Sequence, residues 1–280
     1  MMGAAVWRNA TLHGLILAGA VVMLYPLLWL LGSSFKPEQE IFADPGLWPK
    51  TWTLENYVKG WSGISGISFA TFFQNSFYVS FLSIAGNLLS CSMAAYAFAR
   101  LDFVLKRLWF AAMIVGMMLP YHVLIIPQYI LFNEAGWVNT FLPLVVPKFL
   151  ATEGFFVFLI VQFLRTLPAE LDKAATVDGC GPIQIYWRIA LPLSVPVLVT
   201  TAIFTFIWTW NDFFSQLLYL NDAKRYTVSL GLRLFLDSSS QSQWGPMFAM
   251  SVVSLVPVFA VFLFFQRYLL EGVVAGSLKG

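Results

Sequence analysis

Six apolar stretches, each long enough to cross a bilayer as a helix, dominate this chain of 280 residues. They cover approximately residues 12–31, 76–98, 108–132, 140–164, 193–220 and 247–265. A hydrocarbon core about 30 Å thick requires roughly 20 apolar residues in a helix. None of the stretches alternates like a strand of about ten residues, which excludes a β-barrel. We therefore expect an all-α membrane protein with six transmembrane helices.

The composition supports a membrane protein and excludes several other classes. Hydrophobic residues make up 59% of the chain and charged residues 11%, against about 25% charged in soluble domains. Such a chain cannot be a soluble enzyme, a disordered protein or a nucleic-acid binder. The first stretch is too long for a signal peptide and lacks a small-residue cleavage site, so we interpret it as a retained anchor.

Charge in the loops predicts the orientation. Six spans place both termini on one side, and that side carries nine Lys and Arg residues against six in the longer loops opposite. The positive-inside rule then places both termini in the cytoplasm. No linker, repeat or low-complexity tract interrupts the chain, so we expect residues 1–280 to form a single membrane domain.

The cytoplasmic loop at about 165–192, between spans four and five, has the chemistry of two short helices. Pro168 suits a first helical position, and Glu170 and Asp172 lie in the first turn, where acids favour the helix dipole. Gly179 provides the positive φ that often ends a helix. Pro182 can start a second helix.

The loop is suited to docking. We expect the second helix to run through Arg188 and Leu191-Pro192 to end the excursion before the chain re-enters the membrane. Ala174 and Ala175 keep one helix face smooth, so that another protein can approach closely. A helix pair held between two spans in this way can transmit force.

The loop also resembles a known motif. It contains Lys173-Ala174-Ala175, Asp178-Gly179-Cys180 and Ile189-Ala190-Leu191-Pro192. This order and spacing resembles the EAA loop of ABC importer permeases, E-A-A-x-x-D-G-A followed by I-x-L-P. The resemblance assigns ATPase coupling to Glu170, Lys173, Ala174, Ala175, Asp178, Gly179, Ile189, Leu191 and Pro192. Lys173 replaces the acid of the pattern and reverses its charge, with Glu170, one turn earlier, as the candidate substitute.

The resemblance extends over nearly the whole chain. Trp210-Asn211-Asp212-Phe213 fits the fifth span of MalG-like permease subunits of carbohydrate ABC importers, and the ending at about 267–280 is similar to their tail. It implies a bacterial cytoplasmic (inner) membrane location and ATPase contacts by Glu271, Gly276 and Lys279. The implied partners are a second related permease forming a heterodimer, two ATPase subunits and a periplasmic solute-binding protein that delivers a sugar.

The phosphate-binding pattern G-x-x-x-x-G-K-[ST] is absent from the sequence. We therefore expect a permease subunit rather than an enzyme, with ATP and Mg bound only by partner ATPase subunits. The lone histidines predict no metal site.

Polar residues within spans are candidates for the substrate path. Lys148 and Glu153 lie five residues apart, about 140° around a helix, so we expect them not to pair with each other. Either they face the path, which would favour an acidic or larger oligosaccharide, or Lys148 snorkels and Glu153 meets another helix. Trp208, Asn211 and Asp212 suit sugar binding through an aromatic platform and polar groups, or else interfacial packing.

Two other classes remain as alternatives. A self-contained secondary transporter of a small polar solute would require matching broken helices in two half-repeats, which the sequence lacks. A membrane enzyme would require clustered histidines or acids at one membrane face, and the acids are scattered.

Overall fold

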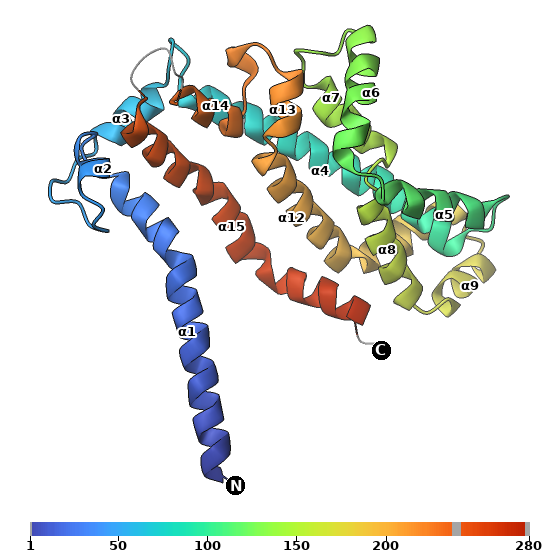
Figure 1. Cartoon of the computed structure of the whole chain (residues 1–280). Helices are drawn as coiled ribbons and strands as arrows, with labels where there is room; N and C mark the ends of the chain where they lie inside the picture. Colours follow the sequence, from blue (N-terminus) through green and yellow to red (C-terminus); the bar gives the residue numbers. More distant parts are fainter. Residues whose placement is uncertain (1, 237–241, 278–280) are drawn as a thin grey trace. The chain divides into compact units, whose positions relative to one another are not determined.

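The computed structural model describes residues 2–236 and 242–277, and within these ranges the chain is helical. An isolated bridge between Ile64 and Ile67 is the only extended pairing there. Four segments are long and apolar enough to cross a membrane: Thr11–Ser33, Phe69–Arg100, Leu142–Thr166 and Trp244–Arg267. Two bent helix pairs raise the total to six if each pair forms one span. The six predicted stretches correspond to these segments (Figure 1).

The third predicted stretch is bent rather than straight. It consists of α5 (Lys106–Met117) and α6 (Tyr121–Glu134), which meet at 102°. Pro120 lies at the break in extended conformation, with ψ of 126°. Proline lacks the N–H that would continue the helix, and its ring disfavours helical geometry in the preceding residue.

The fifth predicted stretch is also interrupted. The segment α10 (Pro182–Ile185), η2 (Tyr186–Ala190, a π-helical turn) and α11 (Leu191–Leu193) meets α12 (Val195–Asn211) at 75°. After Asp212 the chain forms a separate helix, α13 (Phe214–Tyr219). Leu191-Pro192 lies in α11, the last turn before this bend, where the excursion is expected to end.

The fourth predicted stretch contains a local break. α7 (Leu142–Val145) continues into the 3₁₀ helix η1 (Val146–Leu150), and Ala151 then adopts a left-handed conformation with φ of 53°. The chain returns to α-helix in α8 (Gly154–Thr166). Side chains on the two sides of the break therefore do not follow a 3.6-residue period.

The contacts divide the chain into two compact units. The first comprises Met1–Ala70 and Gly231–Val256, and the second Thr71–Leu230 and Pro257–Gly280. The remaining elements are α1 (Met2–Ser33), α2 (Glu40–Ala43), α3 (Glu55–Ser62), α4 (Phe69–Arg100), α9 (Glu170–Val177), η3 (Ala223–Arg225), α14 (Val228–Leu234) and α15 (Trp244–Ser277).

Within the first unit, charged side chains bind backbone groups. Lys36 is fully buried, and its ammonium group donates to the carbonyl oxygens of Asp44 and Gly46 at 2.7 and 2.6 Å. Glu38 accepts from the backbone N–H groups of Trp244 and Gly245, which begin α15. A carboxylate at a helix N-terminus is stabilised by the unpaired N–H groups and the dipole. A hydrogen bond from Lys50 lowers the pKa of Asp44.

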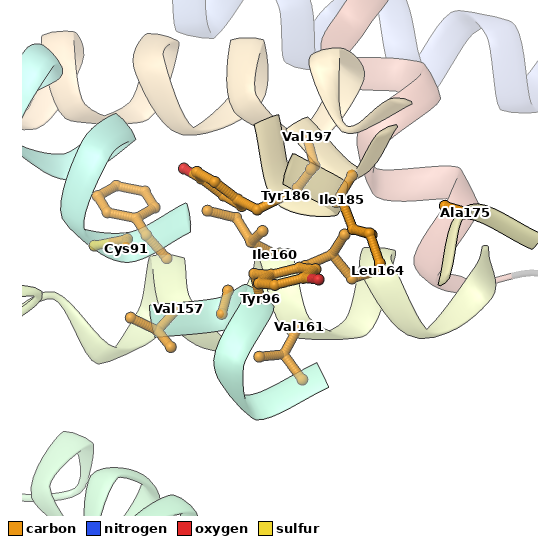
Figure 2. Close-up of a cluster of buried hydrophobic side chains, with 13 residues drawn as sticks. Cys91, Tyr96, Val157, Ile160, Val161, Leu164, Ala175, Ile185, Tyr186 and Val197 are labelled. Atoms are coloured by element: carbon orange, nitrogen blue, oxygen red, sulfur yellow. The ribbon is translucent and has the colours of Figure 1, made fainter. Parts of the chain in front are cut away.

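The second unit has a core in which α4, α8, α12 and the 170–193 segment meet. Figure 2 shows this cluster, with Cys91 and Tyr96 from α4 facing Ile160 and Leu164 from α8. Ala175 belongs to the same buried cluster. The core therefore joins the predicted coupling loop to the spans.

Candidate functional site

The turn after α9 is a Schellman motif. The N–H of Gly179 donates to the carbonyl of Thr176, and the N–H of Cys180 to that of Ala175. Gly179 has φ of 82°, as the motif requires of the residue after the C-cap. Cys180 packs against the cluster that includes Ala175, the apolar contact that accompanies this motif. The predicted helix stop at Asp178-Gly179 is confirmed.

The inward side of α9 rests on one ion pair and one alanine. Asp172 lies 3.1 Å from Nε of Arg100, with 13% of the arginine side chain and 23% of the aspartate exposed. Ala175 is 6% exposed. Ala174 points away and is exposed. The two alanines therefore do not form one smooth face as expected, because successive helical residues lie about 100° apart.

The second helix of the pair is anchored through η2. Tyr186 is buried, and its hydroxyl lies 2.7 Å from that of Ser92 on α4. The rings of Tyr186 and Tyr96 lie 5.4 Å apart. Gln184 accepts a hydrogen bond from the N–H of Gly181 and so caps α10.

The remaining coupling candidates differ in exposure. Ile189 and Leu191 are half-buried and pack against the cluster, while Pro192 is exposed. Glu170, Lys173 and Asp178 are exposed.

The outward side of the pair is apolar. Leu171, Ala174 and Val177 follow an i, i+3, i+6 spacing and therefore share one broad side of α9. Val177 is 88% exposed and Ile183, at the start of the next helix, 74%. An exposed apolar surface of this kind, rimmed by Glu170 and Lys173, is typical of a protein interaction site.

Arg100 is the residue of this region whose role sequence analysis missed. Besides its ion pair with Asp172, it donates from Nη2 to the carbonyl oxygen of Leu167 at 2.9 Å. It therefore binds both the end of α8 and the first turn of α9. The only sequence signal was a charged residue at the end of an apolar helix, and that signal served only to orient the chain.

Lys148 and Glu153 form an ion pair, so the expectation that they do not pair is wrong. The expectation assumed one continuous helix. Instead η1 ends at Leu150, Ala151 is left-handed, and Glu153 precedes the first residue of α8. This break turns the two side chains toward each other. Lys148 therefore does not favour an acidic sugar, because the carboxylate of Glu153 already balances its ammonium group.

Asp212 lies near this pair. It accepts from the N–H of Ser215 at 3.1 Å and interacts electrostatically with Lys148. The Ser215 hydroxyl lies 2.7 Å from that of Tyr121. Tyr121 and Ser215 were not candidates, because nothing in their spacing links them to the charged residues. We call Lys148, Glu153, Asp212, Tyr121 and Ser215 the polar cluster.

Trp208 and Asn211, the aromatic and amide candidates for the substrate path, make other contacts than the polar cluster does. Trp208 stacks on Phe156 of α8 with ring centres 5.1 Å apart and remains 46% exposed. Asn211 is exposed and donates to the carbonyl of Ile207 in its own helix. The structure thus brings Lys148, Glu153 and Asp212 together but does not show Asn211 joined to them.

The candidate ATPase contacts of the tail lie near the end of the last helix or after it. Glu271 and Gly276 belong to the helical backbone of α15. Lys279 lies outside the described residues.

Together, the apolar helices, the broken spans and the helix pair with an outward apolar surface define a multi-pass membrane component. Residues 86–274 match the family described as "Binding-protein-dependent transport system inner membrane component". The chain belongs to this family, and the predicted class of permease subunit is confirmed.

Several relatives are similar over most of their length. The "Probable ABC transporter permease protein YurM" of Bacillus subtilis is 34% identical over 93% of this chain and 85% of its own. The "Trehalose/maltose transport system permease protein MalG" of Thermococcus litoralis is 33% identical over 95% and 96%. Among solved structures, a chain of a bacterial ABC transporter for alginate import shares the fold, with a TM-score of 0.81 at 20% identity, over 93% of this chain and 94% of its own.

Proposed function

We propose that this chain is the permease subunit of an ATP-driven importer of a sugar or oligosaccharide, and that the 170–193 helix pair receives the motion of an ATPase. The observation that carries the proposal is the two-sided character of the pair. Its polar and small residues, Asp172 and Ala175, face the membrane helices, while Leu171 and Val177 face outward. The EAA-type pattern on the same residues and the sugar permeases among the relatives support it.

The remaining partners follow from the same assignment. A second related permease completes the path, two ATPase subunits bind ATP and Mg, and a periplasmic binding protein delivers the sugar. Both termini then lie in the cytoplasm. We infer that residues 1–280 act as one permease domain, with the coupling loop at 165–192 and the tail at 267–280, where Glu271, Gly276 and Lys279 approach the ATPases.

Aspartate substitutions at two valines of similar exposure, Val177 and Val104, test the docking proposal. Val177→Asp places a charge on the outward surface of α9, and Val104→Asp does the same in the neighbouring loop between α4 and α5, where Val104 is 83% exposed. We expect Val177→Asp to reduce ATPase recovery with the tagged chain at least about fivefold, because a desolvated charge at a hydrophobic contact weakens binding. Val104→Asp should leave recovery unchanged.

Two outcomes would contradict the docking proposal. Equal recovery with both variants would show that α9 is not the docking surface. Recovery of the wild-type chain without any ATPase, with uptake intact in vesicles lacking ATP, would instead favour a secondary transporter.

We further propose that the polar cluster faces the substrate path without selecting acidic sugars. The Lys148–Glu153 ion pair has no net charge, and Asp212 adds no positive charge to the cluster. Such a site offers the carboxylate of an acidic sugar no unpaired cation. Trp208, half-exposed and fixed by Phe156, and the exposed Asn211 are the further path candidates.

Glu153→Gln tests this charge balance, with the exposed Glu134→Gln as the matched control. Removing the carboxylate frees Lys148, so we expect uptake of trigalacturonate to rise severalfold relative to maltotriose. Competition between the two trisaccharides in membrane vesicles measures the ratio. An unchanged ratio, or the same rise in Glu134→Gln, would place the cluster outside the path.

A further inference from the structure

The helix pair is fastened to α4 at two points. Arg100 at the end of α4 pairs with Asp172 of α9 at 3.1 Å. Two turns earlier, the hydroxyl of Ser92 lies 2.7 Å from that of Tyr186 in η2. Each helix of the pair therefore has its own polar contact with α4, and all four side chains are largely buried.

The helices that precede and follow the pair in the chain, α8 and α12, connect it to the rest of the protein less directly than α4 does. On one side α8 begins only after the break at Ala151, and on the other α12 meets the pair at a 75° bend. In contrast, α4 runs over 32 residues without a proline. The other helices of this length in the described chain, α1 and α15, contain Pro26 and Pro257.

The opposite part of α4 is fixed to the segment before α14. Asn75 donates from Nδ2 to the carbonyl oxygens of Lys224 and Tyr226 at 2.9 and 2.8 Å. Ser76 accepts from the N–H of Val228 at 2.8 Å. Figure 1 shows α4 extending from this segment to the end of α8 near α9. One unbroken helix therefore connects the pair to a segment about 35 Å away, the rise of some 24 helical residues.

We propose that Arg100 and Asp172 are positioning residues that make α4 move with the helix pair, so that α4 transmits the ATP-driven displacement to residues 224–228. The inference rests on the proposed function and deepens it. The physical basis for coupling between two distant sites is an element whose arrangement both sites bias. The Arg100 contact with Leu167 fixes the guanidinium group, so that Asp172 is held by an oriented partner.

Spin-label distances in the membrane assembly test this. Labels at Thr176→Cys, an exposed position of α9 away from its outward apolar surface, and at the exposed Tyr78→Cys on α4 are measured with and without ATP under conditions that prevent hydrolysis. Cys91→Ala and Cys180→Ala remove the native thiols. In the otherwise unmodified chain we expect one distance that ATP does not change. In Asp172→Asn we expect ATP to produce a second distance, because α9 then moves without α4.

Two further variants distinguish a positioning role of the Arg100–Asp172 pair from a general loss of stability. Asp102→Asn removes an exposed partner of Lys106 at the same end of α4 and should behave as the unmodified chain. The exchange Arg100→Asp with Asp172→Arg should restore the single distance that Arg100→Asp alone loses. In Asp172→Asn we also expect maltotriose uptake per ATP hydrolysed to fall about fivefold or more, because α9 then moves without carrying α4.

The outcomes distinguish this inference from the proposed function. If ATP changes the distance equally in the unmodified chain and in Asp172→Asn, the pair does not fasten α9 to α4 and the inference is overturned alone. If no ATPase accompanies the unmodified chain, the proposed function and the inference fall together.

Discussion

Gly179 has a left-handed backbone, and Gly181, two residues later, does not. The φ angles are 82° and −77°, and a Cβ added at either position meets no atom within 4 Å. Space is therefore equal at the two glycines and only the backbone conformation differs. For an L-residue the left-handed region costs roughly 1–2 kcal/mol.

This difference predicts unequal effects of one substitution. Gly179→Ser should lower the free energy of unfolding of the turn by about 1–2 kcal/mol and reduce uptake. Gly181→Ser should be neutral or slightly stabilising, because serine is favoured at a helix N-cap. Proteolysis at the turn and uptake in vesicles measure the two effects. Equal sensitivity of the variants would mean that the φ of Gly179 is not what the loop requires.

At the scale of elements, α9 separates two adjacent alanines that the motif treats alike. Ala175 contacts the buried cluster, whereas Ala174 is exposed on the outward surface. One alanine therefore serves packing against the spans, and the other permits close approach of a partner. The sequence could predict the helix and its end but not this division, because the inward side depends on where Arg100 and Tyr186 lie.

The same substitution at the two positions should separate these roles. Ala175→Leu overpacks the cluster and should destabilise the chain by about 1–3 kcal/mol. Ala174→Leu should leave thermal stability unchanged while reducing ATPase association and uptake. Thermal unfolding in detergent and recovery of the ATPase provide the two measurements. A loss of stability with Ala174→Leu would contradict the outward placement.

For the whole molecule, the orientation follows from loop charges and from the number of spans. Four straight helices alone would also place the termini on one side, so the bent pairs decide which loops face which side. If each pair is one span, the loops that hold Val104 and Val177 lie together in the cytoplasm, and the loop that holds Val58 lies outside.

Cysteine accessibility tests this arrangement at three exposed valines. In a chain with Cys91→Ala and Cys180→Ala, Val104→Cys and Val177→Cys should react with an impermeant thiol reagent only after the membrane is opened. Val58→Cys, 66% exposed, should react in intact cells. Reaction of Val177→Cys and Val58→Cys from the same side would exclude one span per bent pair, because without the α5–α6 span the loop that holds Val177 lies on the side of Val58.

The positions of the spans, the helix pair and its terminating glycine could be read from the chain, because hydrophobic period, proline and glycine act locally. The pairing of Lys148 with Glu153 could not, since a local break at Ala151 replaced the helical period that the argument assumed. Nor could the contact of Arg100 with Asp172, which joins residues far apart along the chain. Local patterns depend on neighbouring residues, whereas the contact of Arg100 with Asp172 arises only when separate helices pack together.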